Sequence, residues 1–149
     1  MWKLESSERI VRWRDFRKTL NSMPFEQAVR ASAEFWQGCP FAPYYLDPDR
    51  PDLWPTPWEL ISENYYCDLA KSLGMLYTLY FTVHGLSLSP EIRVYYDPET
   101  KYTYNLVLLC QGKYVLNFRD DDNVNIVSIN KNLKLKRIYG STDLKLQDY

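Results

Sequence analysis

The fold is decided by residues 56–80, which read TPWELISENYYCDLAKSLGMLYTLY. Thr56 can cap a helix that has proline at its first position and an acidic residue at its third, which is a well-formed helix start. From Cys67 to Tyr80 apolar residues recur at helical spacing. This spacing predicts a second, longer and largely buried helix that ends by Gly85, and we expect it to be the central helix of the fold.

Two more helices are predicted upstream, followed by a loop. Apolar residues at helical spacing predict an amphipathic helix over residues 7–20, with a basic face formed by interleaved arginines and a lysine. A second helix begins near Pro24 and stops at Gly38. Prolines recur through residues 39–57, and each fixes its φ angle and removes a hydrogen-bond donor. This segment is therefore predicted to be an ordered, extended loop whose aromatic residues wrap the core.

The predicted strands all follow the helices. Segments rich in β-forming residues alternate with turn sequences, which predicts an antiparallel meander with further strands after it. Helices first and strands afterwards define an α+β fold, in which N-terminal helices and a central helix pack on an antiparallel sheet of about four or five strands. The predicted strands cover residues 91–96, 102–110, 114–118, 124–129 and 133–139.

Length and composition favour one packed domain. The chain has 149 residues, of which 46% are hydrophobic and 25% charged, and this balance excludes a mainly disordered or fibrous protein. We expect a single domain, 1–149. Its parts are a helical N-terminal part (1–38), the wrapping loop (39–57), the core (58–139) and a tail (140–149), for which a free segment and a partner-docking arm both stay open.

Charge and cysteine content narrow the function. The formal net charge is −1, so no global field favours nucleic acid or anionic lipid. Three cysteines without CxxC spacing, Cys39, Cys67 and Cys110, predict reduced thiols and no zinc site. The acidic run 119–123 lacks the ligand spacing of a calcium hand and is interpreted as a solvated turn. No metal and no cofactor is predicted, because the sequence also has no phosphate loop or dinucleotide fingerprint.

Three segments resemble the bacterial transglutaminase-like cysteine proteinases. Residues 53–61, LWPTPWELI, resemble the family's Trp-x-Thr-Pro-x-Glu-Phe/Leu-Leu helix, which leads to a Gly-Gly-Asp-Cys nucleophile turn. Residues 104–108 resemble its His-x-Val-Leu strand, and residues 114–118 its Tyr-Val-Leu-Asp-Asn strand. The spacing agrees to within about one residue over roughly residues 48–120. The resemblance implies a transglutaminase-like, papain-like core, with catalytic positions at Cys67 (nucleophile), Asn105 (base) and Asn117 (orienting residue).

Two of these three positions depart from the catalytic pattern. An amide at Asn105 cannot take a proton from the thiol, and Asn117 replaces the orienting aspartate. The only histidine, His84, follows Cys67 by seventeen residues, so one continuous helix would place the two roughly 25 Å apart. The three positions are therefore interpreted as a vestigial triad.

The leading hypothesis is a non-catalytic protein-interaction or structural subunit on a degenerate transglutaminase-like scaffold. Aromatic residues make up 16% of the chain, and large rings supply interface area at low entropic cost. In its overall features the sequence resembles small proteins of tailed bacteriophages. This resemblance implies a virion or assembly component. The predicted contacts come from the aromatic-rich loop and the basic first helix: Tyr44, Tyr45, Trp54, Trp58, Tyr66, Arg9, Arg12 and Arg14.

Two alternatives stay open. Cys67 could serve a cysteine-dependent acyl-transfer enzyme, such as a peptidase, amidase or transglutaminase, with a base that the sequence does not identify. The protein could also inhibit a host protein. The expected partners are proteins, either virion proteins or a host protein, and not nucleic acid or a membrane. Whether the chain forms an oligomer stays open. The start of the chain has no apolar secretory core, so we expect a host-cytoplasmic or virion location without a signal peptide.

Overall fold

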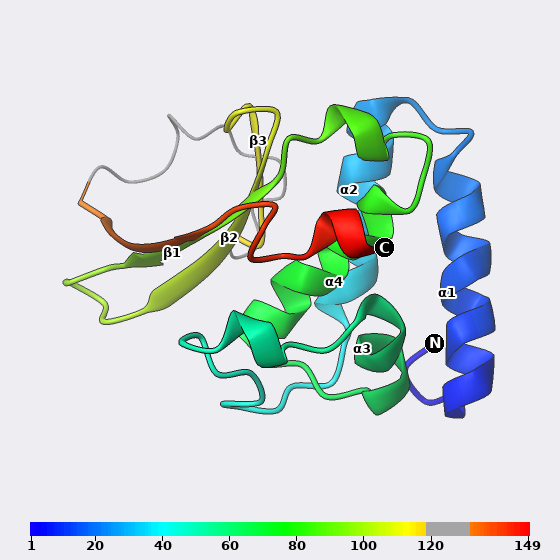
Figure 1. The fold of residues 1–149 in the computed structure, drawn as a ribbon, viewed down its shortest axis with the longest axis horizontal. Helices are drawn as coiled ribbons and strands as arrows, with labels where there is room; N and C mark the ends of the chain where they lie inside the picture. The colour runs from blue at the N-terminus through cyan, green and yellow to red at the C-terminus, as the bar shows by residue number, and fades with distance from the viewer. Residues whose placement is uncertain (119–131) are drawn as a thin grey trace.

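The computed structural model describes residues 1–118 and 132–149. Within these residues, four α-helices pack on a four-stranded antiparallel sheet, which confirms the predicted α+β class (Figure 1). No helix among the described residues has the length and apolar character needed to cross a membrane. The helices are α1 (Ser6–Leu20), α2 (Phe25–Gln37), α3 (Pro57–Glu63) and α4 (Asp68–Tyr80).

The two helices predicted within residues 56–80 form as expected. The Thr56 hydroxyl accepts a hydrogen bond from the Glu59 backbone at 3.3 Å, while the Glu59 carboxylate accepts one from the Thr56 backbone at 2.8 Å. α3 ends where Asn64 adopts a left-handed φ of 59°. α4 then starts directly after Cys67 and continues past Gly74 to Tyr80, so it forms the central helix of the core.

The first two helices also match their predictions to within a residue, but one arginine of the basic face is not at the surface. Arg9 is only 7% exposed. Its guanidinium donates to the carbonyls of Ile61 (2.8 Å), Ser62 (2.7 Å) and Leu4. Because α1 packs against α3, the carbonyls of Ile61 and Ser62 near the end of α3 lie within reach of the side chain. The prediction that Arg9 contacts a partner is therefore wrong, since its charge is used to join α1 to α3.

The sheet has the order β3-β2-β1-β4, with every neighbouring pair antiparallel. β1 to β3 form the predicted meander, and β4 returns to pair with β1. The predicted strand 124–129 and the predicted turn 119–123 lie outside the described residues. The observed strands are β1 (Glu91–Tyr96), β2 (Thr103–Leu109), β3 (Tyr114–Leu116) and β4 (Lys134–Tyr139).

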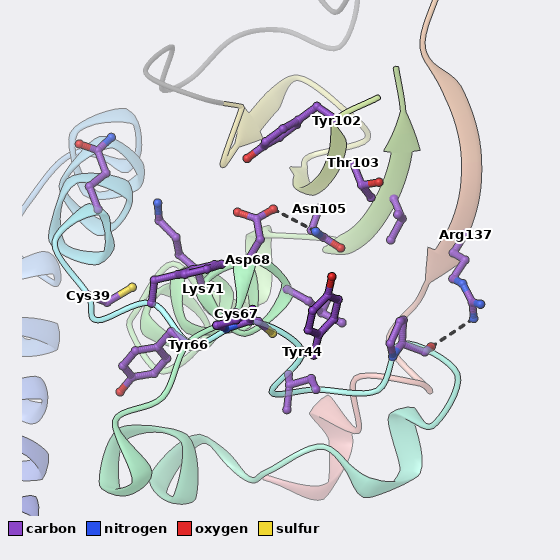
Figure 2. Close-up of a pocket in the computed structure, with 17 residues that line it drawn as sticks. Cys39, Tyr44, Tyr66, Cys67, Asp68, Lys71, Tyr102, Thr103, Asn105 and Arg137 are labelled. Carbon is purple, nitrogen blue, oxygen red and sulfur yellow. Dashed lines mark hydrogen bonds between the residues drawn. The ribbon is translucent and has the colours of Figure 1, made fainter. Parts of the chain in front are cut away.

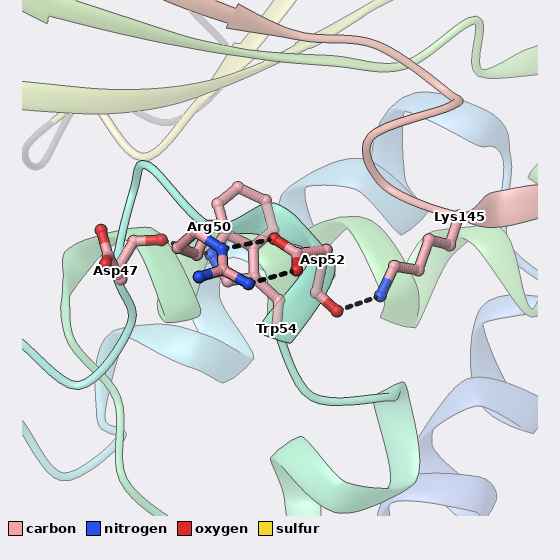
Figure 3. Close-up of polar contacts among 5 residues, drawn as sticks. All are labelled: Asp47, Arg50, Asp52, Trp54 and Lys145. Carbon is pink, nitrogen blue, oxygen red and sulfur yellow. Dashed lines mark hydrogen bonds and ion pairs between the residues drawn. The ribbon is translucent and has the colours of Figure 1, made fainter.

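The proline-rich loop is irregular, as predicted, apart from a short 3-10 turn over Pro51–Leu53. Only some of its aromatic side chains pack against the core, whereas the sequence predicted that they wrap it. Trp54 is 7% exposed, and its indole Nε1 donates to the Asp47 carbonyl at 2.8 Å (Figure 3). Its ring also contacts that of Tyr139. The prediction of Trp54 as a partner contact is therefore wrong, because the loop folds its ring into the core. Phe41 and Tyr44, in contrast, are exposed.

The C-terminal residues pack against the rest of the protein. Leu144 and Leu146 are buried, and the Leu146 carbonyl accepts a hydrogen bond from the Tyr80 hydroxyl at 2.9 Å. Lys145 donates to the carbonyl of Asp52, the residue that also pairs with Arg50 in the proline-rich loop (Figure 3). The segment 140–149 is therefore not a free tail in this structure.

Candidate functional site

A pocket of about 840 Å³ lies between the proline-rich loop, the start of α4 and the sheet (Figure 2). Its walls combine aromatic and apolar side chains with a few charged and amide groups, which is the usual composition of a ligand site. The residues that line it are Gln37, Cys39, Phe41, Pro43, Tyr44, Leu46, Pro48, Tyr66, Cys67, Asp68, Leu69, Lys71, Val94, Tyr102, Thr103, Asn105 and Arg137.

Cys67 stands on the wall of this pocket as the N-cap residue of α4. The side chain is 8% exposed and belongs to the apolar core. Within the described residues, its sulfur makes no hydrogen bond to Asn105, Asn117 or any other group. A cysteine nucleophile is ordinarily activated by an adjacent base, and no such base contacts this thiol among those residues.

Asp68, the first residue of α4, faces the other two predicted catalytic positions. Asn105 Nδ2 donates to Asp68 Oδ2 at 2.9 Å, which Figure 2 marks as a dashed line. Asn117 Nδ2 lies 3.3 Å from Asp68 Oδ1. The side chain that pairs with positions 105 and 117 is therefore the carboxylate of Asp68, and the thiol of Cys67 takes no part in this pairing.

Asn117 and Ser72 support this arrangement from inside the protein. Asn117 is nearly buried and has a left-handed φ of 68°, a conformation that asparagine tolerates better than most residues. Its Nδ2 also lies 2.8 Å from Ser72 Oγ and 3.1 Å from the Asn105 carbonyl, so several acceptors share its two hydrogens. The Ser72 hydroxyl donates to the Asn105 carbonyl. We call Asp68, Ser72, Asn105 and Asn117 the amide–carboxylate network; it joins α4 to β2 and to the end of β3.

The remaining polar groups of the pocket differ in how far they are neutralised. Arg137 forms an ion pair with Asp49, whereas no ion pair of Lys71 exists within the described residues. Burial raises the pKa of the Cys39 thiol to about 11, although the positive charge of Lys71 acts in the opposite direction. Burial also raises the pKa of Tyr66 well above its usual range, and its hydroxyl donates to the Leu60 carbonyl.

The structure brings some of the predicted site residues together and leaves others apart. Tyr44, Tyr66, Cys67 and Asn105 line the pocket, and Asn117 lies behind its wall in the amide–carboxylate network. The other predicted contacts lie elsewhere: Trp58 packs against Phe81 and Tyr149, Tyr45 pairs with Tyr65, Arg14 pairs with Asp15, and Arg12 is exposed on α1.

Sequence reasoning missed Asp68 and Arg137, which line the pocket, and Ser72, which lies behind its wall. Asp68 and Ser72 are four residues apart, so they lie on one face of α4, and this spacing was a usable signal beside Cys67. Arg137 offered no such signal, because only the pairing of β4 with β1 brings it to the pocket.

His84 does not line the pocket. It follows the C-terminal end of α4, and its Nε2 lies 3.1 Å from the Leu20 carbonyl. The unbroken helix between Asp68 and Tyr80 is about 20 Å long at 1.5 Å per residue, which separates His84 from Cys67. Among residues 1–118 and 132–149, no cluster of three histidine, cysteine or acidic side chains could hold a metal ion.

No family model matches this sequence, and no curated protein sequence matches it either. The fold, in contrast, is similar to the transglutaminase-like fold of Legionella pneumophila LapG. The EGTA-treated structure of LapG has a TM-score of 0.69 at 14% identity, and the match covers 91% of this chain and 74% of LapG. The calcium-bound structure has a TM-score of 0.69 at 10% identity, with 94% and 82% covered. At these identities the likeness shows the fold alone: this chain has a transglutaminase-like fold.

Proposed function

We propose that this chain is a non-catalytic binding protein whose pocket holds a segment of a partner protein. The observation that carries the proposal is the amide–carboxylate network, in which Asn105 and Asn117 hold the carboxylate of Asp68. An amide has no proton equilibrium near neutral pH, so neither asparagine can act as a general acid or base. The network is suited to holding a fixed polar surface at the pocket wall.

The position of the one histidine supports the same conclusion. General bases near neutral pH are most often histidines, and His84 lies beyond the far end of α4. The Cys67 thiol, although it lines the pocket, has no hydrogen-bonded base within the described residues. A pocket of about 840 Å³ with aromatic walls is large enough for several side chains of a peptide.

The proposal keeps the role expected from the sequence, a virion or assembly subunit, with another virion protein as partner. An inhibitor of a host protein would use the same pocket. In both cases the bound segment contacts the pocket residues, so one binding assay addresses both.

A cysteine-dependent acyl-transfer enzyme is the second candidate, and one observation favours it. Cys67 stands at the N-terminus of α4 on the pocket wall, where the helix dipole stabilises a thiolate. The fold is also that of LapG, a cysteine protease. This candidate requires a base that the described part of the chain does not place beside the thiol.

A peptide-display screen separates the two functions. The wild-type protein is used to enrich peptides from a random library, and each enriched peptide is then measured against Tyr44→Ala, Tyr65→Ala and Cys67→Ala. Tyr44 lines the pocket, whereas Tyr65 is an exposed tyrosine that does not and serves as the matched control. We expect Tyr44→Ala to weaken binding by about tenfold, a typical loss for an aromatic contact. Tyr65→Ala and Cys67→Ala are expected to leave binding within about twofold, which is the range of minor contacts.

Two results would overturn the proposal. Peptides that are cut or covalently joined by the wild type, but not by Cys67→Ala, would establish the acyl-transfer enzyme. A screen that enriches no peptide dependent on Tyr44 would show that the pocket is not a binding site for protein segments.

A further inference from the structure

Tyr44 presents an unused aromatic ring at the mouth of the pocket. The residue has a left-handed φ of 59°, which is unfavourable for any residue with a side chain, and it is 97% exposed. Within the described residues, its ring makes no aromatic contact and its hydroxyl no hydrogen bond. In Figure 2 the side chain rises from the proline-rich loop and its hydroxyl points toward Asn105. A strained, exposed ring beside a pocket is well placed to contact a ligand.

Asp68 adds an unneutralised negative charge to the same pocket. Its two hydrogen-bond partners, Asn105 and Asn117, are neutral amides, and no ion pair to Asp68 exists within the described residues. Each carboxylate oxygen can accept more than one hydrogen bond, so Asp68 keeps acceptor capacity after these two contacts. The amides fix the orientation of the carboxylate without cancelling its charge.

Among the described residues, neither positive group of the pocket forms an ion pair with this carboxylate. Arg137 is already paired with Asp49. Lys71 is one helical turn from Asp68, but no ion pair joins the two side chains, and in Figure 2 Asn105 and Tyr44 lie on the side of Asp68 away from Lys71. The part of the pocket between Asp68 and Tyr44 therefore combines a carboxylate, an amide and an aromatic ring.

We infer that this part of the pocket binds a cationic side chain, an arginine or lysine of a partner peptide, between the carboxylate of Asp68 and the ring of Tyr44. A guanidinium or ammonium group donates a charge-assisted hydrogen bond to a carboxylate and makes a cation–π contact with a tyrosine ring. The inference rests on the proposed function, because it names the chemistry of the segment that the pocket holds.

The test uses short blocked peptides and NMR titration of the full chain. The probe is acetyl-Gly-Ser-Arg-Ser-Gly-amide, and its matched control carries citrulline, an uncharged analogue, in place of arginine. We expect the arginine peptide to bind about tenfold tighter than the citrulline peptide. The contact rests on charge, so this difference should shrink as salt is added.

Three variants locate the effect. Asp68→Asn keeps the shape of the side chain but removes its charge, and we expect it to remove most of the preference for arginine over citrulline. Glu34→Gln removes one negative charge from an exposed position on α2 outside the pocket and should leave the preference unchanged. Lys71→Met removes the neighbouring positive charge, and we expect binding of the arginine peptide to become about twofold to threefold tighter, a modest change for a screened charge.

Different failures have different meanings. Equal binding of the arginine and citrulline peptides, with both weakened by Tyr44→Ala, would overturn the cationic inference and leave the binding function intact. A third peptide, acetyl-Gly-Ser-Glu-Ser-Gly-amide, tests the opposite charge. If it bound most tightly and lost that binding in Lys71→Met, the pocket would recognise an anion through Lys71. Binding of none of these peptides, together with a failed display screen, would overturn both proposals.

Discussion

Two hydrogen-bond networks lie on α4, one at each half of the helix. They differ in whether all of their donors and acceptors are paired within the protein. In the C-terminal half, Thr78 Oγ1 accepts hydrogen bonds from the indole Nε1 of Trp13 (2.9 Å) and of Trp36 (2.8 Å). The same hydroxyl donates to the Gly74 carbonyl at 2.7 Å. All three side chains are fully buried. In the N-terminal half, the amide–carboxylate network opens onto the pocket.

The difference separates a structural role from a binding role. A closed network in the core uses every donor and acceptor, so it fixes how α1 and α2 pack on α4 and leaves nothing for a ligand. The amide–carboxylate network keeps acceptor capacity on Asp68 at the pocket wall. The closed network should therefore matter most for stability, and the open one most for binding.

The largest expected effect comes from Thr78→Val, which keeps the shape of the side chain but removes the shared acceptor. Two buried indole N–H groups then lose their partner, and each unsatisfied donor costs about 1–3 kcal/mol. We expect the free energy of unfolding to fall by about 3 kcal/mol in urea titrations. Thr19→Val is the control, since Thr19 is exposed and its hydroxyl donates only to the Phe16 carbonyl. Equal losses in both variants would refute the difference between the two networks.

A smaller effect is expected from Asn117→Asp, which places a second carboxylate about 3.3 Å from that of Asp68. Repulsion between two like charges in a partly buried site should lower the free energy of unfolding by about 2 kcal/mol near neutral pH. The loss should shrink as pH falls, because protonation of one carboxylate removes the repulsion. Urea titrations over a pH series measure this trend. Gln111→Glu adds the same charge in the exposed turn between β2 and β3 and should lack the trend.

The smallest effect concerns Cys39, whose pKa burial raises from 9.0 to about 11. Between these values the unfolded chain loses the thiol proton while the folded protein keeps it, so stability falls as pH rises through this window. Tyrosines with raised pKa values contribute in the same alkaline range, so the informative quantity is the difference between wild type and Cys39→Ala. We expect the wild type to lose more stability than Cys39→Ala from about pH 9 to about pH 11. Parallel curves would show that the Cys39 thiol is not desolvated in the folded protein.

The parts of the fold that depend on local sequence were predictable. The Thr56 cap, the helical spacing of α4 and the β-rich segments of β1 to β3 are properties of neighbouring residues. Arg9 and Trp54 were misplaced because their burial depends on carbonyls and rings from distant segments. An arginine is ordinarily exposed unless its charged group finds partners in the interior. The three carbonyls that bind Arg9 come from separate segments, so no local sequence pattern reveals them.

The resemblance and the structure differ by one residue in the side chain that faces Asn105 and Asn117, and this residue decides how the pocket is interpreted. The family resemblance placed Cys67 opposite Asn105 and Asn117 with an uncertainty of about one position. Successive residues at a helix start point in different directions, so Asp68 faces the two amides and Cys67 does not. Only the register between α4 and β2 settles which side chain meets Asn105.

The most direct test of the central claim is the rate at which iodoacetamide modifies Cys67, located by peptide mass, in the folded protein and in the urea-unfolded chain. A binding pocket with a nearly buried thiol and no adjacent base predicts slower modification in the folded protein at each pH tested. Faster modification of Cys67 in the folded protein near neutral pH would reveal an activated thiolate, which would contradict the non-catalytic account and favour the acyl-transfer enzyme.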